Sequence, residues 1–167
     1  MLQPFFHIKK SNRSQQQIEL LPPAPEKKSL NLLSKVYLPS DIQMVLNAAI
    51  DEGLISKTQS EELCKIMESI VFHPQLKSYF STDVEVYNER EIMTSTGQII
   101  IPDRLVITQS KCAVIIDYKT GVYYDKHQQQ LENYALIIKQ MGYKIDKKIL
   151  IYIHPELKII HLNESYV

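Results

Sequence analysis

Two carboxylates and an ammonium interrupt two strongly apolar segments near the middle of the chain. Asp103 lies within IIIPDRLVI (residues 99–107), and Asp117 and Lys119 end the segment CAVIIDYK (residues 112–119). Burial of a lone carboxylate is unfavourable unless the group is paired with a cation or binds a metal. An ion pair between Asp117 and Lys119 would account for two of the three groups, but it leaves Asp103 unexplained.

The loop between the two segments decides whether the carboxylates meet. A two-residue loop would place Asp103 opposite Ile116 and would turn Asp117 to the other face of the sheet. A three-residue loop (109–111) places Asp103 directly opposite Asp117 on one face, with side chains about 5 Å apart. Lys119 is two residues further along and shares that face. We therefore predict the three-residue loop, or a bulge with the same effect.

Such a cluster has a definite chemistry. Two adjacent carboxylates repel each other unless a cation lies between them, and hard oxygen ligands in this arrangement suit Mg²⁺ or Mn²⁺. A divalent ion lowers the pKa of a bound water and neutralises charge on phosphoryl oxygens. Lys119 would orient the attacking water and stabilise the transition state. The residues therefore predict phosphodiester hydrolysis.

The composition limits the setting in which this chemistry would occur. The chain has 167 residues, enough for one domain with its own core, and equal numbers of basic and acidic residues, 19 of each. Zero formal net charge predicts weak binding to DNA by the chain alone and favours a partner. Two isolated cysteines, no long apolar run and no signal-peptide pattern predict a cytoplasmic protein without a membrane span.

The apolar periodicity divides the chain into a tail and one domain. Residues 1–28 are polar and proline-rich and are predicted to be a flexible tail or linker, and 29–167 form the domain. Within it, helical spacing and capping residues predict three helices, started by Ser40 or Asp41, by Thr58 with Glu61, and by Asp125 with Gln128. Period-two patterns predict strands at 84–92, broken by NERE at 88–91, and at 99–107, 112–118, 149–153 and 157–162. Pro102 predicts that the second of these is an edge strand or is locally distorted. A helix between the third and fourth strands indicates an α/β or α+β layer fold.

The same residues resemble a known nuclease family. Pro102-Asp103, thirteen intervening residues, and Asp117-Tyr118-Lys119 match the PD-(D/E)XK signature. The segments DRLVIT and AVIIDYKTG, followed by HQQQL and then Tyr134-Ala135, resemble the RecB-type nuclease domain at the C-terminus of UvrD/RecB/AddA-like helicase–nucleases. Over about residues 40–155, the resemblance implies a restriction-endonuclease-like αβββαβ core with a mixed central sheet flanked by helices.

The resemblance also implies an activity and its partners. It implies a Mg²⁺- or Mn²⁺-dependent deoxyribonuclease, by preference an exonuclease, acting on DNA in double-strand-break repair and recombination. No GxxxxGK[ST] motif occurs in the chain, so a helicase or ATPase partner would be a separate domain or subunit. Iron–sulfur nucleases of related type need four cysteines, and the chain has two, so no iron–sulfur cluster is expected.

Residue roles follow from the resemblance by position. The implied metal ligands are Asp103, Asp117 and the main-chain carbonyl of Tyr118, with Glu89 as a further candidate and Glu91 as its possible substitute. The implied catalytic lysine is Lys119, and Gln130 and Tyr134, four residues apart on one helix face, would position the lysine or the DNA backbone. The implied substrate-binding residues are Arg104, Thr120 and His127. Tyr123 and Tyr124 either stack on bases or pack their loop against the core.

One departure from the family pattern bears on activity. Many RecB-type nucleases carry a metal-binding histidine on an upstream helix, and residues 30–36 occupy that place without a histidine. His7 is the only histidine before His73, and it lies in the predicted tail. The alternative function is therefore a catalytically weak or inactive nuclease-like module that binds DNA or a partner protein.

Overall fold

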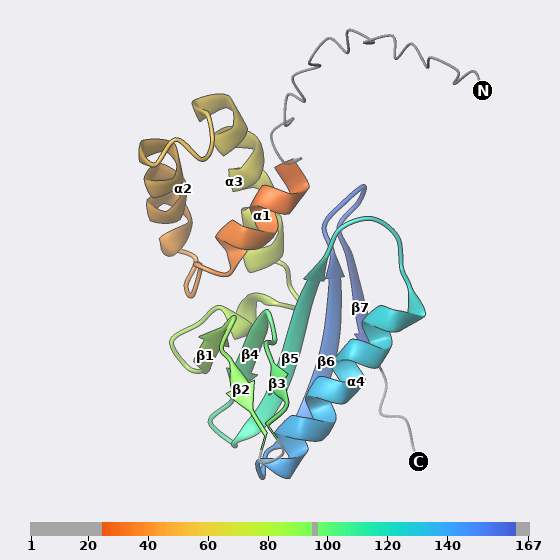
Figure 1. The fold of residues 1–167 in the computed structure, drawn as a ribbon. Coiled ribbons are helices and arrows are strands. Elements are labelled where there is room, and N and C mark those ends of the chain that lie inside the picture. Colours follow the sequence, from red (N-terminus) through yellow and green to blue (C-terminus); the bar gives the residue numbers. More distant parts are fainter. Residues whose placement is uncertain (1–24, 95–96, 163–167) are drawn as a thin grey trace, which may run out of the picture.

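The protein is built around a mixed sheet with helices on both faces. The computed structural model describes residues 25–94 and 97–162. Five strands form the main sheet in the order β1-β4-β5-β6-β7, and β2 pairs with β3 in a separate hairpin (Figure 1). The strands are β1 (Glu85–Asn88), β2 (Ile92–Met93), β3 (Ile99–Ile100), β4 (Arg104–Ile107), β5 (Cys112–Lys119), β6 (Lys144–Tyr152) and β7 (Lys158–Leu162). The helices are α1 (Pro25–Leu33), α2 (Asp41–Asp51), α3 (Lys57–Val71), the short 3₁₀ helix η1 (Lys77–Tyr79) and α4 (Asp125–Gln140).

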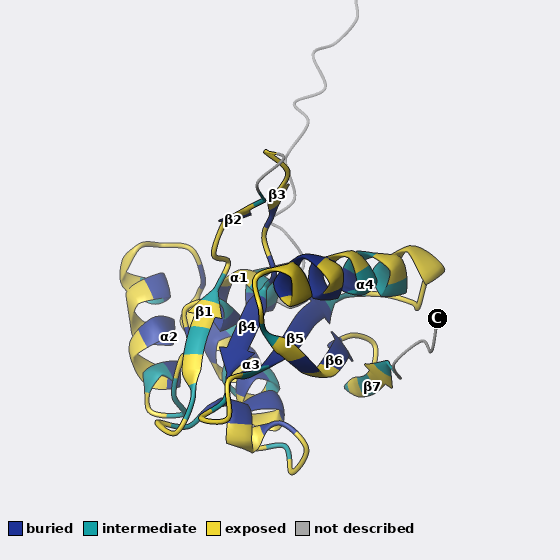
Figure 2. Ribbon diagram, turned by 90° about the horizontal axis from the view of Figure 1, so that it is seen from below, coloured by how far each residue is buried: buried dark blue, intermediate teal, exposed yellow. Residues whose placement is uncertain are grey.

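Two apolar cores lie on the two faces of the main sheet. Alternation along β5 sends Val114, Ile116 and Tyr118 into the core shared with α1, α2 and α3. Ala113 and Ile115 face the opposite core, which is closed by α4 and the β2-β3 hairpin. The central strands are consequently buried on both sides, as Figure 2 shows, which explains why β5 is an almost continuous apolar run.

The order of elements confirms the predicted fold class. The sequence α3-β1-β4-β5-α4-β6 is the expected αβββαβ order, and β7 follows. The β5–β6 pair is parallel with α4 as the crossover, and the other pairs of the main sheet are antiparallel. The protein therefore has an α+β fold with a mixed sheet flanked by helices. Among the helices in the described part of the chain, none is long and apolar enough to cross a membrane.

Two predicted strands are each divided in the structure. The segment 99–107 gives β3 in the hairpin and β4 in the main sheet, and Ile92, expected in the first strand, belongs to β2. Pro102 has no N–H for a sheet ladder, so the expected distortion there is confirmed, and it is strong enough to end a strand. At the end of β1, Glu89 adopts φ 47°, which turns the chain out of the sheet.

The predicted start of α2 is confirmed, with Ser40 as its N-cap, and the starts of α3 and α4 are displaced. The capping box of α3 is formed by Ser56 and Gln59, two residues before the predicted pair, because the same reciprocal bonds form there at 3.2 and 3.0 Å. Asp41 accepts hydrogen bonds from the backbone of the preceding turn, and Asp125 lies inside α4 after Tyr124. At the N-terminal end, α1 begins at Pro25, within the stretch 1–28 that was expected to be a tail; residues 1–24 lie outside the described residues.

Arg104 ties the sheet to the helical layer. Its side chain is completely buried and lies over the Phe80 ring, 3.9 Å from the centroid. The guanidinium donates to the carbonyls of Val36 at 2.7 Å, Tyr37 at 3.2 Å and Tyr79 at 2.8 Å. The expectation that Arg104 binds substrate is therefore wrong: alternation along the strand turns it away from the Asp103 face and into the protein interior.

Replacement of this arginine should be costly. In Arg104→Met, the carbonyls of Val36 and Tyr79 lose a buried donor, and we expect the free energy of unfolding in urea to fall by about 3 kcal/mol or more. Arg104→Lys should also lower the free energy of unfolding, because one ammonium cannot replace the planar set of N–H donors of a guanidinium. Arg90→Met, at an exposed arginine, is the matched control and should change the value by about 0.5 kcal/mol or less. Unchanged stability of Arg104→Met would contradict this account.

Candidate active site

The β4–β5 register brings Asp103 and Asp117 to the same place. Arg104 pairs with Ile116, so Asp103, one residue earlier, lies opposite Asp117. The connecting loop has the predicted three residues: Lys111 adopts φ 56° and its N–H donates to the Thr108 carbonyl at 2.8 Å. The predicted register is confirmed, and both carboxylates belong to the face covered by α4.

Because of Pro102 and Asp103, the hydrogen bonds of the Tyr118 backbone depart from the regular pattern of an antiparallel pair. Extension of the register by two residues places Pro102 opposite Tyr118, but proline has no N–H to give to the Tyr118 carbonyl. The Tyr118 N–H is satisfied differently, because it donates to Oδ2 of Asp103 at 2.8 Å. The N–H and C=O of one strand residue point to the same side. The Tyr118 carbonyl therefore faces the edge at which the Asp103 carboxylate lies, and its role as a metal ligand stays a prediction.

A chain of polar contacts links Lys119 to helix α4. The Lys119 ammonium is paired with Asp117, whose side chain is 1% exposed, and it donates to Oε1 of Gln130 at 3.0 Å. Nε2 of Gln130 donates to the Tyr134 hydroxyl at 2.8 Å, which donates to the Ile101 carbonyl at 3.2 Å. An ammonium has three donors, so two partners fix Lys119 and leave one donor for a substrate oxygen.

Burial makes this carboxylate pair hard to ionise. Desolvation, and then the charge of Asp117, raise the pKa of Asp103 to about 7. Desolvation also raises the pKa of Asp117, against the opposing effect of Lys119. The metal-free pair therefore tends to hold a shared proton near neutral pH. A divalent cation in place of that proton would let both carboxylates ionise.

The donor set fits a hard divalent ion only in part. Within residues 25–94 and 97–162, no group of three or more His, Cys, Asp or Glu side chains is placed to hold a metal. Two carboxylates and one backbone carbonyl are present, and Mg²⁺ sites commonly use one or two carboxylates with water and substrate phosphates for the remainder. These oxygen atoms therefore fit a Mg²⁺ or Mn²⁺ ion whose remaining ligands are water and a substrate phosphate.

The remaining predicted site residues lie around this centre. The exposed Glu89 donates its N–H to the Asp103 carbonyl at 3.1 Å, and its charge contributes to the raised pKa of Asp103. Thr120 is half-buried directly after Lys119. His127 contacts the Tyr152 hydroxyl through Nδ1 at 2.7 Å. Sequence reasoning missed Tyr152, which pairs in register with Lys119; its only signal was its place in the late buried strand.

The segment that lacks the expected histidine has a structural role. Leu32, Leu33 and Val36 of residues 30–36 are buried in the core between the helical layer and the sheet, and the Val36 carbonyl accepts from Arg104. These side chains pack on the face of the sheet opposite to Asp103 and Asp117. His7 lies outside the described residues.

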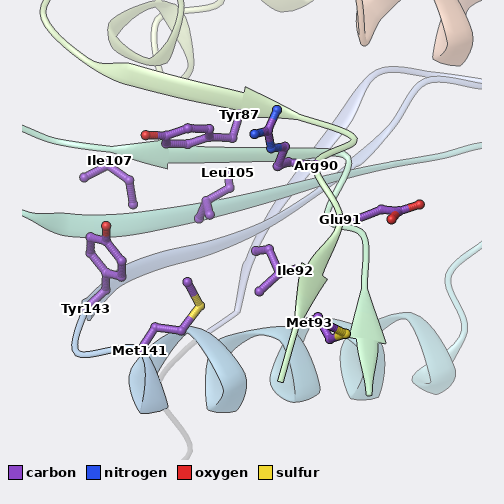
Figure 3. Close-up of a pocket in the computed structure, with 9 residues that line it drawn as sticks. All are labelled: Tyr87, Arg90, Glu91, Ile92, Met93, Leu105, Ile107, Met141 and Tyr143. Carbon is purple, nitrogen blue, oxygen red and sulfur yellow. The ribbon is translucent and has the colours of Figure 1, made fainter. Parts of the chain in front are cut away.

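A pocket lies at the other end of the α4 layer (Figure 3). It has a volume of about 370 Å³ and is bounded by the hairpin, the β1–β4 edge and the end of α4. Its lining residues are Tyr87, Arg90, Glu91, Ile92, Met93, Leu105, Ile107, Met141 and Tyr143. It includes none of the carboxylates or the lysine of the candidate site, and the Glu91 carboxylate points away from it.

Comparisons with known proteins leave the family open. No family model matches the chain, and no curated protein matches it. One similar solved structure is named "Crystal structure of SSO0001"; it is 18% identical, and the match covers 86% of this chain and 77% of the other, with a TM-score of 0.37. A similarity this weak carries no argument about fold or function.

The buried carboxylates should make the metal-free protein less stable as the pH rises. An unfolded aspartate titrates near pH 3.9, whereas the pKa of Asp103 in the folded chain is raised to about 7. Between these values the folded state binds more protons, so the free energy of unfolding falls from about pH 4 to about pH 7. We expect a loss of about 1–3 kcal/mol from this source in EDTA.

Asp103→Asn should remove that part of the pH dependence and be more stable than the parent at pH 8. Urea denaturation at pH 5, 6, 7 and 8 measures the effect. Asp51→Asn, at an exposed aspartate on α2, should keep the parental slope. Identical slopes for the parent and Asp103→Asn would show that the carboxylate is not desolvated.

Proposed function

We propose that the protein is a metal-dependent DNA nuclease domain that hydrolyses phosphodiester bonds. The observation that carries the proposal is the convergence of Asp103, Asp117 and Lys119 on one face of the sheet, in a register set by the three-residue loop. Two desolvated carboxylates beside an oriented ammonium are costly for folding, and a site for a divalent cation that in turn binds a phosphate accounts for them. The PD-(D/E)XK pattern of the sequence supports the same proposal.

Each residue has a defined task in this proposal. Asp103, Asp117 and the Tyr118 carbonyl would hold Mg²⁺ or Mn²⁺, which when bound polarises the phosphate and activates water. Lys119 would give its remaining N–H to a phosphate oxygen or to the attacking water, where it stabilises the charge that develops. Gln130 and Tyr134 act on Lys119 rather than on the substrate, because they connect it to the Ile101 carbonyl.

The setting of this nuclease is also a proposal. A chain with zero net charge gains little from long-range attraction to DNA. A helicase or ATPase domain or subunit that delivers DNA would compensate, as expected for a helicase–nuclease in double-strand-break repair and recombination. An exonuclease that receives the unwound strand from such a motor needs little affinity of its own.

A second candidate function is a catalytically weak module that binds DNA or a partner protein. Two observations favour it. Lys119 already neutralises Asp117 in the metal-free chain, and the described residues supply no third acidic or imidazole ligand. In this alternative the ion pair replaces the metal and stabilises the sheet.

Cleavage of end-labelled single- and double-stranded DNA with Mg²⁺ or Mn²⁺ tests the first function. We expect the parent to cleave, and Asp117→Asn and Lys119→Met to lose at least about 100-fold in rate, as is usual when a group that stabilises transition-state charge is removed. Asp51→Asn and Lys57→Met, at exposed positions on α2 and α3, are matched controls and should keep the parental rate. No cleavage by the folded parent at high concentration would favour the binding module.

Gln130 offers a test of positioning. In Gln130→Ala the Lys119 ammonium loses one of its two fixed partners, so we expect kcat to fall about 10- to 100-fold with little change in KM. Gln130→Glu retains an acceptor for Lys119 and should recover part of the loss. Equal effects on kcat and KM, or no effect, would contradict the positioning role.

A further inference from the structure

Four aromatic rings form a continuous row at the start of α4. Tyr123 and Tyr124 come from the loop after β5, His127 from the first turn of α4, and Tyr152 from the end of β6. Ring centroids are separated by 6.3 Å between Tyr123 and Tyr152, 5.9 Å between Tyr152 and His127, and 5.4 Å between His127 and Tyr124. Spacings of this size are those of packed aromatic pairs. We call these four residues the aromatic row.

The aromatic row adjoins the candidate active site. Tyr152 is the register partner of Lys119 on the neighbouring strand, so both side chains lie on the α4 face. His127 is anchored to the Tyr152 hydroxyl at 2.7 Å. Burial, and then the charges of Lys119 and Lys126, lower the pKa of His127, which keeps its ring neutral at pH 7. A neutral ring is suited to stacking rather than to charge pairing.

Packing alone does not account for the outer part of the row. Tyr124 is 53% exposed and Tyr123 is 39% exposed, next to the exposed Val122. The rings are nevertheless held in place, because the Tyr123 hydroxyl donates to Oε1 of Gln128 at 2.8 Å and the Tyr124 ring meets His127 edge-on. A fixed, exposed apolar group beside a reactive centre indicates a ligand.

The charges near the row indicate what kind of ligand this is. Nζ of Lys126 lies 5.1 Å from the centroid of the Tyr124 ring, and Lys119 is the register partner of Tyr152 in the middle of the row. Aromatic rings with cations beside them match a segment of nucleic acid, in which bases alternate with phosphates. Bases within a duplex are stacked on each other and present only their edges, so only an unpaired base offers its face to a tyrosine.

We propose that the aromatic row binds an unpaired nucleobase next to the phosphate held at Asp103, Asp117 and Lys119, which makes single-stranded nucleic acid the substrate. This inference rests on the proposed nuclease function for the position of the phosphate. The base-binding surface itself does not depend on catalysis. In this surface the base stacks on the exposed ring of Tyr124. The rings of Tyr123 and Tyr152 line its side, and His127 connects Tyr152 to α4.

Binding in EDTA tests the proposal without cleavage. The probes are fluorescein-labelled dT20, an abasic 20-mer with the same phosphates, rU20 and a 20-base-pair duplex, followed by anisotropy with the full chain. We expect dT20 to bind about 5- to 100-fold more tightly than the abasic strand, as base–tyrosine stacking gives, and more tightly than the duplex. If rU20 binds as tightly as dT20, the protein recognises the face of the base in either nucleic acid. If rU20 binds much more weakly than dT20, the unpaired base comes from DNA.

Variants locate the effect on the protein. Tyr124→Ala should lose most of the difference between dT20 and the abasic strand, and Tyr124→Phe should keep it, because stacking needs the ring and not the hydroxyl. Tyr87→Ala is the control, since Tyr87 is likewise an exposed tyrosine but lies on β1 away from the row. Equal affinity of the parent for dT20 and the abasic strand, a comparison that needs no variant, would overturn the proposal.

The same strands assayed with Mg²⁺ separate this inference from the proposed function. Base-dependent binding without cleavage would refute the nuclease and retain the binding surface. Cleavage of single-stranded and duplex DNA at equal rates, with no dependence on Tyr124, would retain the nuclease and refute the binding surface.

Discussion

The pairing of β4 with β5 is the constraint on which the candidate site depends. Side chains on a strand alternate between faces, so a shift of one residue would send Asp103 into the helical core and leave Asp117 alone on the α4 face. The loop at residues 109–111 prevents that shift through the left-handed conformation of Lys111 and its bond to Thr108. A turn remote from the charged groups therefore decides whether they meet.

Two adjacent residues where β4 begins contact different layers of the fold. Arg104 reaches three carbonyls of the helical layer and its connections, and this fixes the strand against α1 and η1. Asp103, one residue earlier, emerges on the opposite face and accepts the Tyr118 N–H. The buried guanidinium therefore fixes the backbone from which Asp103 extends. Pro102 adds the last condition, since it withholds an N–H that a strand would otherwise give to Tyr118.

The sequence was informative where a short-range rule operates and misleading where partners are distant. The register could be predicted because loop length and alternation fix it locally. The division of 99–107 into two strands could not, because β3 leaves the sheet to pair with β2. The charged Arg104 suggested a substrate contact because its partners, which include Val36, Tyr79 and Phe80, come from elements far away along the chain. Tyr152 was missed for the same reason, since only the parallel β5–β6 pairing brings it to Lys119.

The central proposal is that Asp103 and Asp117 share one divalent cation beside Lys119. Titration of Mn²⁺ into the full chain at pH 8, followed by the loss of its electron paramagnetic resonance signal, measures this directly and needs no substrate. We expect binding of one ion per chain that is lost in both Asp103→Asn and Asp117→Asn and retained in Asp51→Asn. Equal Mn²⁺ binding by the parent and the two site variants would contradict the claim.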